Sequence, residues 1–277
     1  MPVIAITREM GSLGKDVAAG LGKELGLPVV YHEVIDHLAD RMRVRRSHVI
    51  KLLDGKAGLL ERLTADQTSL FIHSADEIVT KALEGKGAVI RGWGATHLMR
   101  DIPHVVTVRV CAPLETRRKR MLERLNTDDA AQVAEEIHRN DEAHTAIVKR
   151  HYGLNWTDSE HYDLVLNTER LSIDECVEEV LGIVRSPKFA ETEASRARLE
   201  DLALSARVWA ALRRAPDTRD TRATVTAAGG VIAVGGCSTE EMLKIVEVAV
   251  GVPGVRDVRY KPRDPGDLRE DPRPAFH

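Results

Sequence analysis

The chain has 277 residues, of which 43% are hydrophobic and 30% charged, and its 40 basic and 43 acidic residues give a net charge of −3. This composition is typical of a globular protein, and the near balance of charge excludes a global field that recruits nucleic acid or a membrane surface. The three cysteines, Cys111, Cys176 and Cys237, are far apart, which indicates reduced thiols in a cytoplasmic protein. A first strand starting at Val3 and the lack of any apolar run near the roughly 20 residues that span a bilayer predict neither signal peptide nor transmembrane segment.

The first predicted element is an apolar run of strand length, Val3–Ile6, followed by a glycine loop and a segment with helical periodicity. The stretch ITREMGSLGKDVA is close to the phosphate-loop pattern G-x-x-x-x-G-K-[ST]. Gly14 and Lys15 fit this pattern. Glu9 stands at the first glycine, however, and Asp16 stands at the hydroxyl residue. Strand, loop and helix still follow one another in the order that a phosphate-binding loop requires.

Strand-like and helix-like segments alternate over the first two-thirds of the chain. Further strands are predicted at Val29–Tyr31, Ala88–Ile90, Val105–Val110 and Leu164–Leu166. Helices are predicted at Asp36–Met42, His48–Leu53, Ser69–Leu83, Leu114–Arg124, Asp129–Lys149 and Ile173–Val184. The alternation predicts an α/β fold with a mostly parallel sheet flanked by helices and ligands at the carboxyl ends of the strands. Together with the loop after Val3–Ile6, this order of elements resembles the P-loop NTPase type of fold.

The pattern changes around Ser186-Pro187, and a smaller α/β unit follows. Its predicted elements are a helical stripe from Leu199 to Leu212, strands at Ala223–Ala227 and Val231–Val234, a helix at Glu240–Val250 and a strand at Val255–Tyr260. We therefore predict a first domain over residues 1–185, a charged linker over 186–197 and a second domain over 198–261. Residues 262–277 are rich in proline and charge, which predicts a disordered tail.

Several blocks of the first domain resemble the cytidylate kinase-like family of P-loop nucleoside monophosphate kinases. They are TREMGSLGK from Thr7, LGLP from Leu25 with His32-Glu33 after it, Val89-Ile90 before a glycine, APLE from Ala112 with Arg117, and YDLVLNT from Tyr162. The resemblance covers roughly residues 1–184. It implies transfer of the γ-phosphate of ATP, with Mg²⁺, to a nucleoside monophosphate such as CMP. Members of this branch commonly lack the first glycine and the loop hydroxyl, so a working phosphate loop is implied despite Glu9.

The predicted ATP site lies at the start of the first helix. It comprises Gly11, Ser12, Leu13, Gly14, Lys15, Asp16 and Arg117. Backbone N–H groups and the helix dipole favour anions there, and Lys15 is expected to contact the phosphates although a solvated surface lysine is the alternative. Asp16 either binds Mg²⁺ through its carboxylate or is an ordinary acidic residue in the first helical turn.

The catalytic candidates are Lys15, Arg117 and Asp141. Arg117 lies where the family carries its mobile lid. Helical spacing puts Arg117, Arg120 and Arg124 on one side, as a cation clamp on the transferring phosphates or as a solvated basic face. Asp141 matches an acidic position of the family, whereas His144 stands where the family usually has an arginine.

The acceptor side departs further from the family pattern. Its substrate-binding candidates are Glu33, Arg41 and Arg91. Tyr31 replaces a frequent aspartate, and Gly92-Trp93 replaces a Gly-Arg pair. Arg91 offers a replacement cation, although neighbouring side chains of a strand point to opposite faces. Arg41 and the arginines after it either bind an acceptor phosphate or form a solvated helix surface.

The second domain resembles a BON domain, a small module usually associated with binding phospholipid, membranes or other ligands. The stretches GGVIAVGG from Gly229 and VPGVRDV from Val252 carry the resemblance. These glycines and valines equally suit a hairpin turn and a half-buried sheet with no binding role. Because no cluster of catalytic residue types occurs here, we expect this module to bind a ligand or to form a homo-oligomer.

Three functions remain open from the sequence. The first is an ATP-dependent nucleoside monophosphate kinase whose C-terminal module binds a ligand or partner. The second is a nucleotide-binding sensor with weak catalysis, and the third is a kinase for another small acceptor. Tyr31 and Trp93 favour the latter two, while Lys15 and Arg117 favour nucleotide binding in all three.

Overall fold

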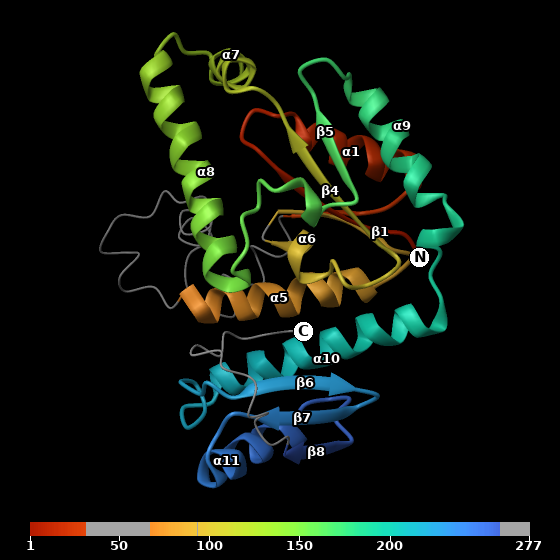
Figure 1. The fold of residues 1–277 in the computed structure, drawn as a ribbon, viewed down its shortest axis with the longest axis vertical. Coiled ribbons are helices and arrows are strands. Elements are labelled where there is room, and N and C mark those ends of the chain that lie inside the picture. Colours follow the sequence, from red (N-terminus) through yellow and green to blue (C-terminus); the bar gives the residue numbers. More distant parts are fainter. Residues whose placement is uncertain (32–66, 93, 261–277) are drawn as a thin grey trace. The chain divides into compact units, whose positions relative to one another are not determined.

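The computed structural model describes residues 1–31, 67–92 and 94–260 (Figure 1). The contacts divide the chain into two compact units. The first comprises Met1–Ala65 and Glu84–Glu191, and the second comprises Asp66–Leu83 and Thr192–His277. The predicted helices Asp36–Met42 and His48–Leu53 and the predicted tail lie outside the described residues.

The first unit contains a five-stranded parallel sheet in the order β2-β3-β1-β4-β5. Its strands are β1 (Val3–Arg8), β2 (Val29–Val30), β3 (Ala88–Arg91), β4 (Val105–Cys111) and β5 (Leu164–Asn167). The predicted parallel α/β sheet is therefore confirmed. β1 lies in the centre of the sheet, so the residues that follow it lie between the carboxyl ends of β3 and β4.

Helices flank this sheet (Figure 1). They are α1 (Gly14–Leu25), α6 (Ala95–Leu98), α7 (Leu114–Leu125), α8 (Ala130–Tyr152) and α9 (Ile173–Val184), with short 3₁₀ turns at Ser159–His161 and Pro187–Phe189. α1 packs against α9, and Val17 and Leu21 of α1 are fully buried in a core that also holds Val180 of α9. α1 ends at Gly26, whose φ of 63° suits glycine better than any residue with a Cβ. The helical periodicity predicted after the glycine loop is thus that of the core-facing side of α1.

The second unit contains two long helices and a small mixed sheet. Its elements are α5 (Gln67–Leu83), α10 (Glu193–Arg214), β6 (Thr224–Ala228), β7 (Val231–Gly235), α11 (Thr239–Val250) and β8 (Asp257–Tyr260). β6 is antiparallel to β7, which is parallel to β8. Gly229 and Gly230 have φ values of 56° and 85°, as the two central residues of a tight hairpin require. The predicted hairpin around a glycine turn is confirmed.

Two elements do not follow the predicted domain limits. α5 packs along α10 and belongs to the second unit, although the sequence pattern assigned it to residues 1–185. α10 begins at Glu193, inside the predicted linker, after a capping box formed by Thr192 and Ser195. A boundary at residue 185 stays a prediction.

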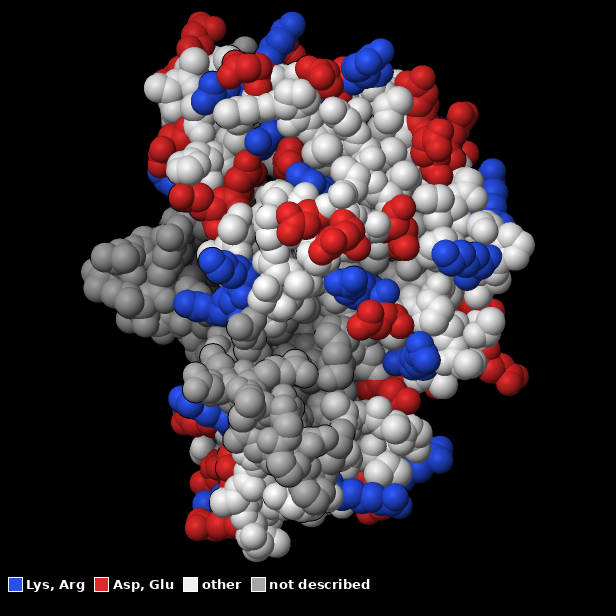
Figure 2. Space-filling view, in the orientation of Figure 1, with Lys and Arg blue, Asp and Glu red and all other residues white. Residues whose placement is uncertain are grey.

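The described helices include none long and apolar enough to cross a membrane. Figure 2 shows basic and acidic side chains interspersed over the visible face. This distribution agrees with the small net charge of −3. It also means that any anion site on this face must be built locally.

Candidate nucleotide site

The loop after β1 is shaped by a tight turn over Glu9 to Ser12. The backbone N–H of Ser12 donates to the carbonyl of Glu9 at 3.2 Å, and Gly11 has a φ of 83°. A Cβ at Gly11 would lie 2.8 Å from the backbone oxygen of Arg117. Glycine is therefore required twice at this position, for its backbone conformation and for the close approach of the chain segment that starts α7.

The loop ends at the N-terminus of α1. Leu13 has a φ of 61° and a ψ of 11°, an uncommon conformation for a residue with a Cβ. Its carbonyl accepts the N–H groups of Asp16 and Val17 at 2.9 and 3.0 Å. The N–H groups of Gly14 and Lys15 donate to no acceptor among the described residues. Free N–H groups at the positive end of a helix dipole favour an anion.

The side chains of Lys15 and Asp16 are exposed at this helix start. Gly14 is buried between strands, since a Cβ there would lie 2.6 Å from Cβ of Arg8 and 3.3 Å from Cβ of Val110. The structure therefore brings the predicted loop residues together, with a lysine and a carboxylate beside two free backbone donors. This arrangement can bind a phosphate group and place a cation next to it.

Ser12 connects the loop to β4 and to the residue after β5 through its hydroxyl and its carbonyl group. Its side chain is fully buried and its hydroxyl donates to the carbonyl of Val110 at 3.0 Å. The carbonyl of Ser12 accepts the hydroxyl of Thr168 at 2.8 Å, and Thr168 in turn accepts Nη1 of Arg120 at 2.9 Å. Arg120, predicted to belong either to a cation clamp or to a solvated basic face, thus holds the residue after β5 against the loop.

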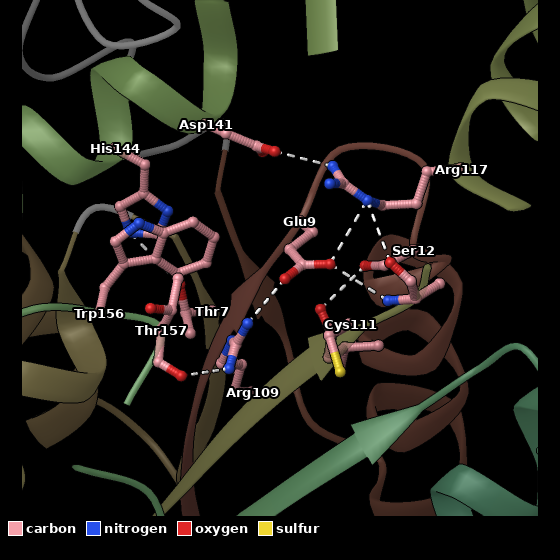
Figure 3. Close-up of polar contacts among 12 residues, drawn as sticks. Thr7, Glu9, Ser12, Arg109, Cys111, Arg117, Asp141, His144, Trp156 and Thr157 are labelled. Carbon is pink, nitrogen blue, oxygen red and sulfur yellow. Dashed lines mark hydrogen bonds and ion pairs between the residues drawn. The ribbon is translucent and has the colours of Figure 1, made fainter. Parts of the chain in front are cut away.

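Glu9 is enclosed by two arginines, as Figure 3 shows. One carboxylate oxygen accepts Nη2 of Arg109 at 2.7 Å. The other accepts the backbone N–H of Ala112 at 3.2 Å and lies 3.4 Å from Nε of Arg117. The Glu9 side chain is only 12% exposed. A carboxylate this buried needs opposite charge beside it, and β4 and α7 supply that charge.

Arg117 is largely buried and contacts the loop backbone. Its Nε donates to the carbonyl of Ala112 at 3.1 Å, and its Nη1 donates to the carbonyl of Met10 at 3.4 Å and to Asp141 of α8 at 2.9 Å. Burial raises the pKa of Asp141, and the neighbouring Arg117 charge opposes that rise. Nη2 of Arg117 donates to no group in the described part of the chain. Two of the three predicted catalytic candidates, Arg117 and Asp141, therefore lie in direct contact beside the loop.

His144 lies on α8 one turn after Asp141. Its ring stacks on Trp156 with centroids 4.1 Å apart, and its Nε2 lies 3.4 Å from the hydroxyl of Thr7 (Figure 3). Burial lowers the pKa of His144 to about 3, with smaller contributions from His97 and nearby arginines. His144 is therefore neutral near pH 7 and supplies no positive charge where the resembling family usually has an arginine.

Among the predicted acceptor residues, the structure describes Arg91 at the end of β3. Arg91 is 6% exposed, and its guanidinium carbon lies 3.8 Å from the ring centroid of Tyr31. This is a cation–π contact between Tyr31, which replaces a frequent aspartate of the family, and Arg91, the predicted replacement cation. Glu33, Arg41 and Trp93 lie outside the described residues.

Sequence reasoning missed the partners of Glu9 and the role of Thr168. Arg109 lies near the carboxyl end of β4, and Thr168 directly follows β5. Both positions can be found by one rule, since polar residues at the carboxyl ends of adjacent parallel strands meet at the same edge. Thr168 was recognised only as part of a sequence block, without a contact.

The sheet order, the loop between β1 and α1, and the free N–H groups at the helix start define a P-loop kinase-like fold. The chain belongs to the cytidylate kinase-like family, whose model matches residues 3–170. It is 26% identical to the cytidylate kinase of Sulfolobus acidocaldarius over 182 residues, covering 65% of this chain and 93% of that protein. It is 27% identical to the cytidylate kinase of Sulfurisphaera tokodaii over 177 residues, covering 62% and 89%.

A solved structure of an uncharacterized protein from Eubacterium ventriosum supports the same fold. It has a TM-score of 0.53 and 22% identity, and the match covers 67% of this chain and 99% of that one. The family match ends at residue 170 and does not reach β6, β7 or β8. The resemblance of the C-terminal module to a BON domain has no family match and stays a prediction.

Proposed function

We propose that this protein transfers the γ-phosphoryl group of ATP to a nucleoside monophosphate, with CMP as the first acceptor to test. The observation that carries the proposal is the helix start with free N–H groups on Gly14 and Lys15 and an exposed lysine side chain, at the carboxyl end of the central strand. The named activity of the two archaeal relatives supports a nucleotide acceptor.

On the donor side, the residues fit the charge of a nucleoside triphosphate. The N–H groups at the start of α1 would bind phosphate oxygens, and Lys15 would neutralise the terminal phosphates. Nη2 of Arg117 is the part of that side chain left to reach a phosphate oxygen. In the reaction an acceptor phosphate oxygen bonds to the γ-phosphorus, the bond to the β-phosphate oxygen breaks, and ADP leaves. These residues would stabilise charge without forming a covalent intermediate.

Mg²⁺ would be held mainly by the nucleotide. The described residues contain no group of three or more His, Cys, Asp or Glu placed to bind a metal ion. Asp16, exposed in the first turn of α1, fits a single carboxylate contact to Mg²⁺, directly or through water. When bound, the ion would neutralise phosphate charge and orient the transferring group.

The test is ADP production by the purified protein with Mg-ATP and each nucleoside monophosphate in turn. The proposal expects one or a few monophosphates to raise ADP production at least tenfold above ATP alone, and CMP is expected among them. Nucleotide binding with no stimulation by any monophosphate would refute nucleoside monophosphate kinase activity.

A second candidate, a kinase for another small acceptor or a sensor with weak catalysis, is favoured by the acceptor side. Arg91 is engaged by Tyr31, and the neutral His144 supplies no charge near the loop. This candidate expects tight Mg-ATP binding without turnover on nucleoside monophosphates. Under either function, we propose that the C-terminal module binds a ligand or a second copy of the chain, which calorimetry and sedimentation would detect.

A further inference from the structure

Glu9 occupies the loop position where the phosphate-loop pattern has its first glycine. A glycine at this position has no side chain that could contact other segments. Glu9 differs because both of its carboxylate oxygens are bonded, in addition to its backbone N–H and carbonyl groups. Its N–H donates to the carbonyl of Val110 at 3.1 Å, and its carbonyl accepts Ser12 N–H.

The carboxylate of Glu9 joins three segments that are far apart in sequence. Arg109 comes from β4, Ala112 from the connection after β4, and Arg117 from α7. The side chains of Arg109 and Arg117 are 11% and 9% exposed. Charges this buried keep their geometry only with opposite charge beside them, so Glu9 fixes both guanidinium groups.

Arg117 then transmits this constraint back to the loop. It donates to the carbonyls of Met10 and Ala112, and its backbone oxygen lies where Gly11 admits no Cβ. Arg109 is held at its other side by the carbonyl of Thr157 at 2.6 Å. Loss of the Glu9 charge would leave Arg109 without a carboxylate partner among the described residues and Arg117 with Asp141 alone.

We propose that Glu9 is a positioning residue that sets the shape of the phosphate loop through Arg109 and Arg117, in place of the first glycine. The proposal deepens the proposed function and rests on it for the ligand, Mg-ATP. Glu9 acts on the nucleotide through the two arginines and the backbone of Met10 to Leu13. A glycine at this position would therefore impair the site although it restores the general pattern.

The test uses the full chain with Glu9→Gly, Glu9→Gln and Glu9→Asp, and with Glu135→Gln as the matched control. Glu135 forms an exposed ion pair with Arg139 on α8 at 3.1 Å, away from the loop contacts described above. The first measurement is amide hydrogen exchange of residues 9–14 without nucleotide. The second is Mg-ATP affinity by calorimetry, followed by KM and kcat for ATP where turnover is present.

Glu9→Gln and Glu9→Gly are expected to speed loop exchange at least about tenfold and to weaken Mg-ATP binding by a similar factor, because a charge-assisted contact is lost. Exchange in β5 and α9 should stay unchanged, Glu9→Asp should recover part of the affinity, and Glu135→Gln should behave as the parent protein. Binding by Glu9→Gly as tight as that of the parent would overturn the proposal. Faster exchange throughout the first unit would also overturn it, since Glu9 would then serve stability alone.

Loop exchange is measured without ligand, so it tests Glu9 separately from the proposed function. If the parent protein binds no Mg-ATP, the proposed function fails, while local loosening of the loop in Glu9→Gln still supports the positioning role. A double variant, Glu9→Gln with Arg109→Gln, is expected to exchange more slowly than Glu9→Gln alone because it removes a buried unpaired cation. Equal or faster exchange in the double variant would count against the pairing.

Discussion

Gly11 has two roles in the loop: it adopts a positive φ, and it lets the backbone of Arg117 come close to the loop. The substitution Gly11→Ala tests both. The φ of 83° at Gly11 would place alanine in the left-handed region, which costs about 1 kcal/mol. The new Cβ would also lie 2.8 Å from the backbone oxygen of Arg117 and 3.1 Å from its Cα. Because this neighbour is backbone, it cannot rotate away, and such overpacking costs roughly 1–3 kcal/mol. We therefore expect Gly11→Ala to lower the free energy of unfolding by about 2–4 kcal/mol.

Gly26→Ala is the matched control for this substitution. Gly26 has a φ of 63° in the same unit, and a Cβ there would meet nothing within 4 Å. It should therefore show the conformational cost of about 1 kcal/mol alone. Urea unfolding monitored by circular dichroism measures both variants, and calorimetry measures Mg-ATP affinity, which should fall only in Gly11→Ala. If Gly11→Ala is no more destabilising than Gly26→Ala, the close approach of α7 to the loop is wrong.

Four further predictions test the site and the two units. Lys15→Ala should weaken Mg-ATP binding at least about tenfold by calorimetry, with unchanged unfolding, because an exposed charge-assisted phosphate contact is lost; equal affinity would remove Lys15 from the site. Asp16→Ala should raise the Mg²⁺ concentration needed for half-maximal activity and Asp16→Ser should not, whereas an unchanged magnesium titration leaves Asp16 a helix-start residue. The pKa of His97 is lowered to about 4 and that of His144 to about 3, mainly by burial. As the pH falls, the unfolded chain binds protons on these histidines before the folded chain does. The free energy of unfolding should therefore decrease below about pH 6.5, by roughly 2 kcal/mol per histidine at pH 5. His144→Asn should make this decrease with pH smaller. The fragment 1–185 should retain Mg-ATP binding but unfold at lower urea, because α5 loses its partner α10; a folded fragment without binding would show that the C-terminal unit helps to build the site.

The strands of the sheet could be predicted because each is a short apolar run, and the burial of a strand in the sheet explains that apolar character. β1, β3 and β4 are buried along nearly their whole length, which is the environment of a central strand in a parallel sheet. The loop could be predicted from Gly14 and Lys15 because the phosphate-binding geometry is local in sequence. Gly11 follows the same logic, since a turn that needs a positive φ selects glycine.

The side-chain network around the loop could not be predicted in the same way. Glu9 pairs with Arg109 and Arg117, and Ser12 accepts a hydrogen bond from Thr168, across 100 or more positions of the chain. Sequence spacing on α7 placed the arginines on one side but did not show what that side faces. In the structure Arg117 faces Glu9 and Asp141. The spacing therefore predicted which side of α7 carries the arginines, but it did not predict the carboxylates that Arg117 contacts.

α5 shows the same limit at the scale of a whole helix. Its periodic apolar residues predicted a helix, but Ser74, Asp76 and Glu77 are buried as well, so burial extends beyond the apolar stripe. One partner is α10, which begins 110 positions after α5 ends (193 − 83) and cannot be inferred from the pattern of α5 itself. α5 lies inside the family match over residues 3–170, whereas α10 lies outside it. The limits of the family and of the compact units therefore differ, because the C-terminal unit includes a helix that belongs to the kinase-like sequence.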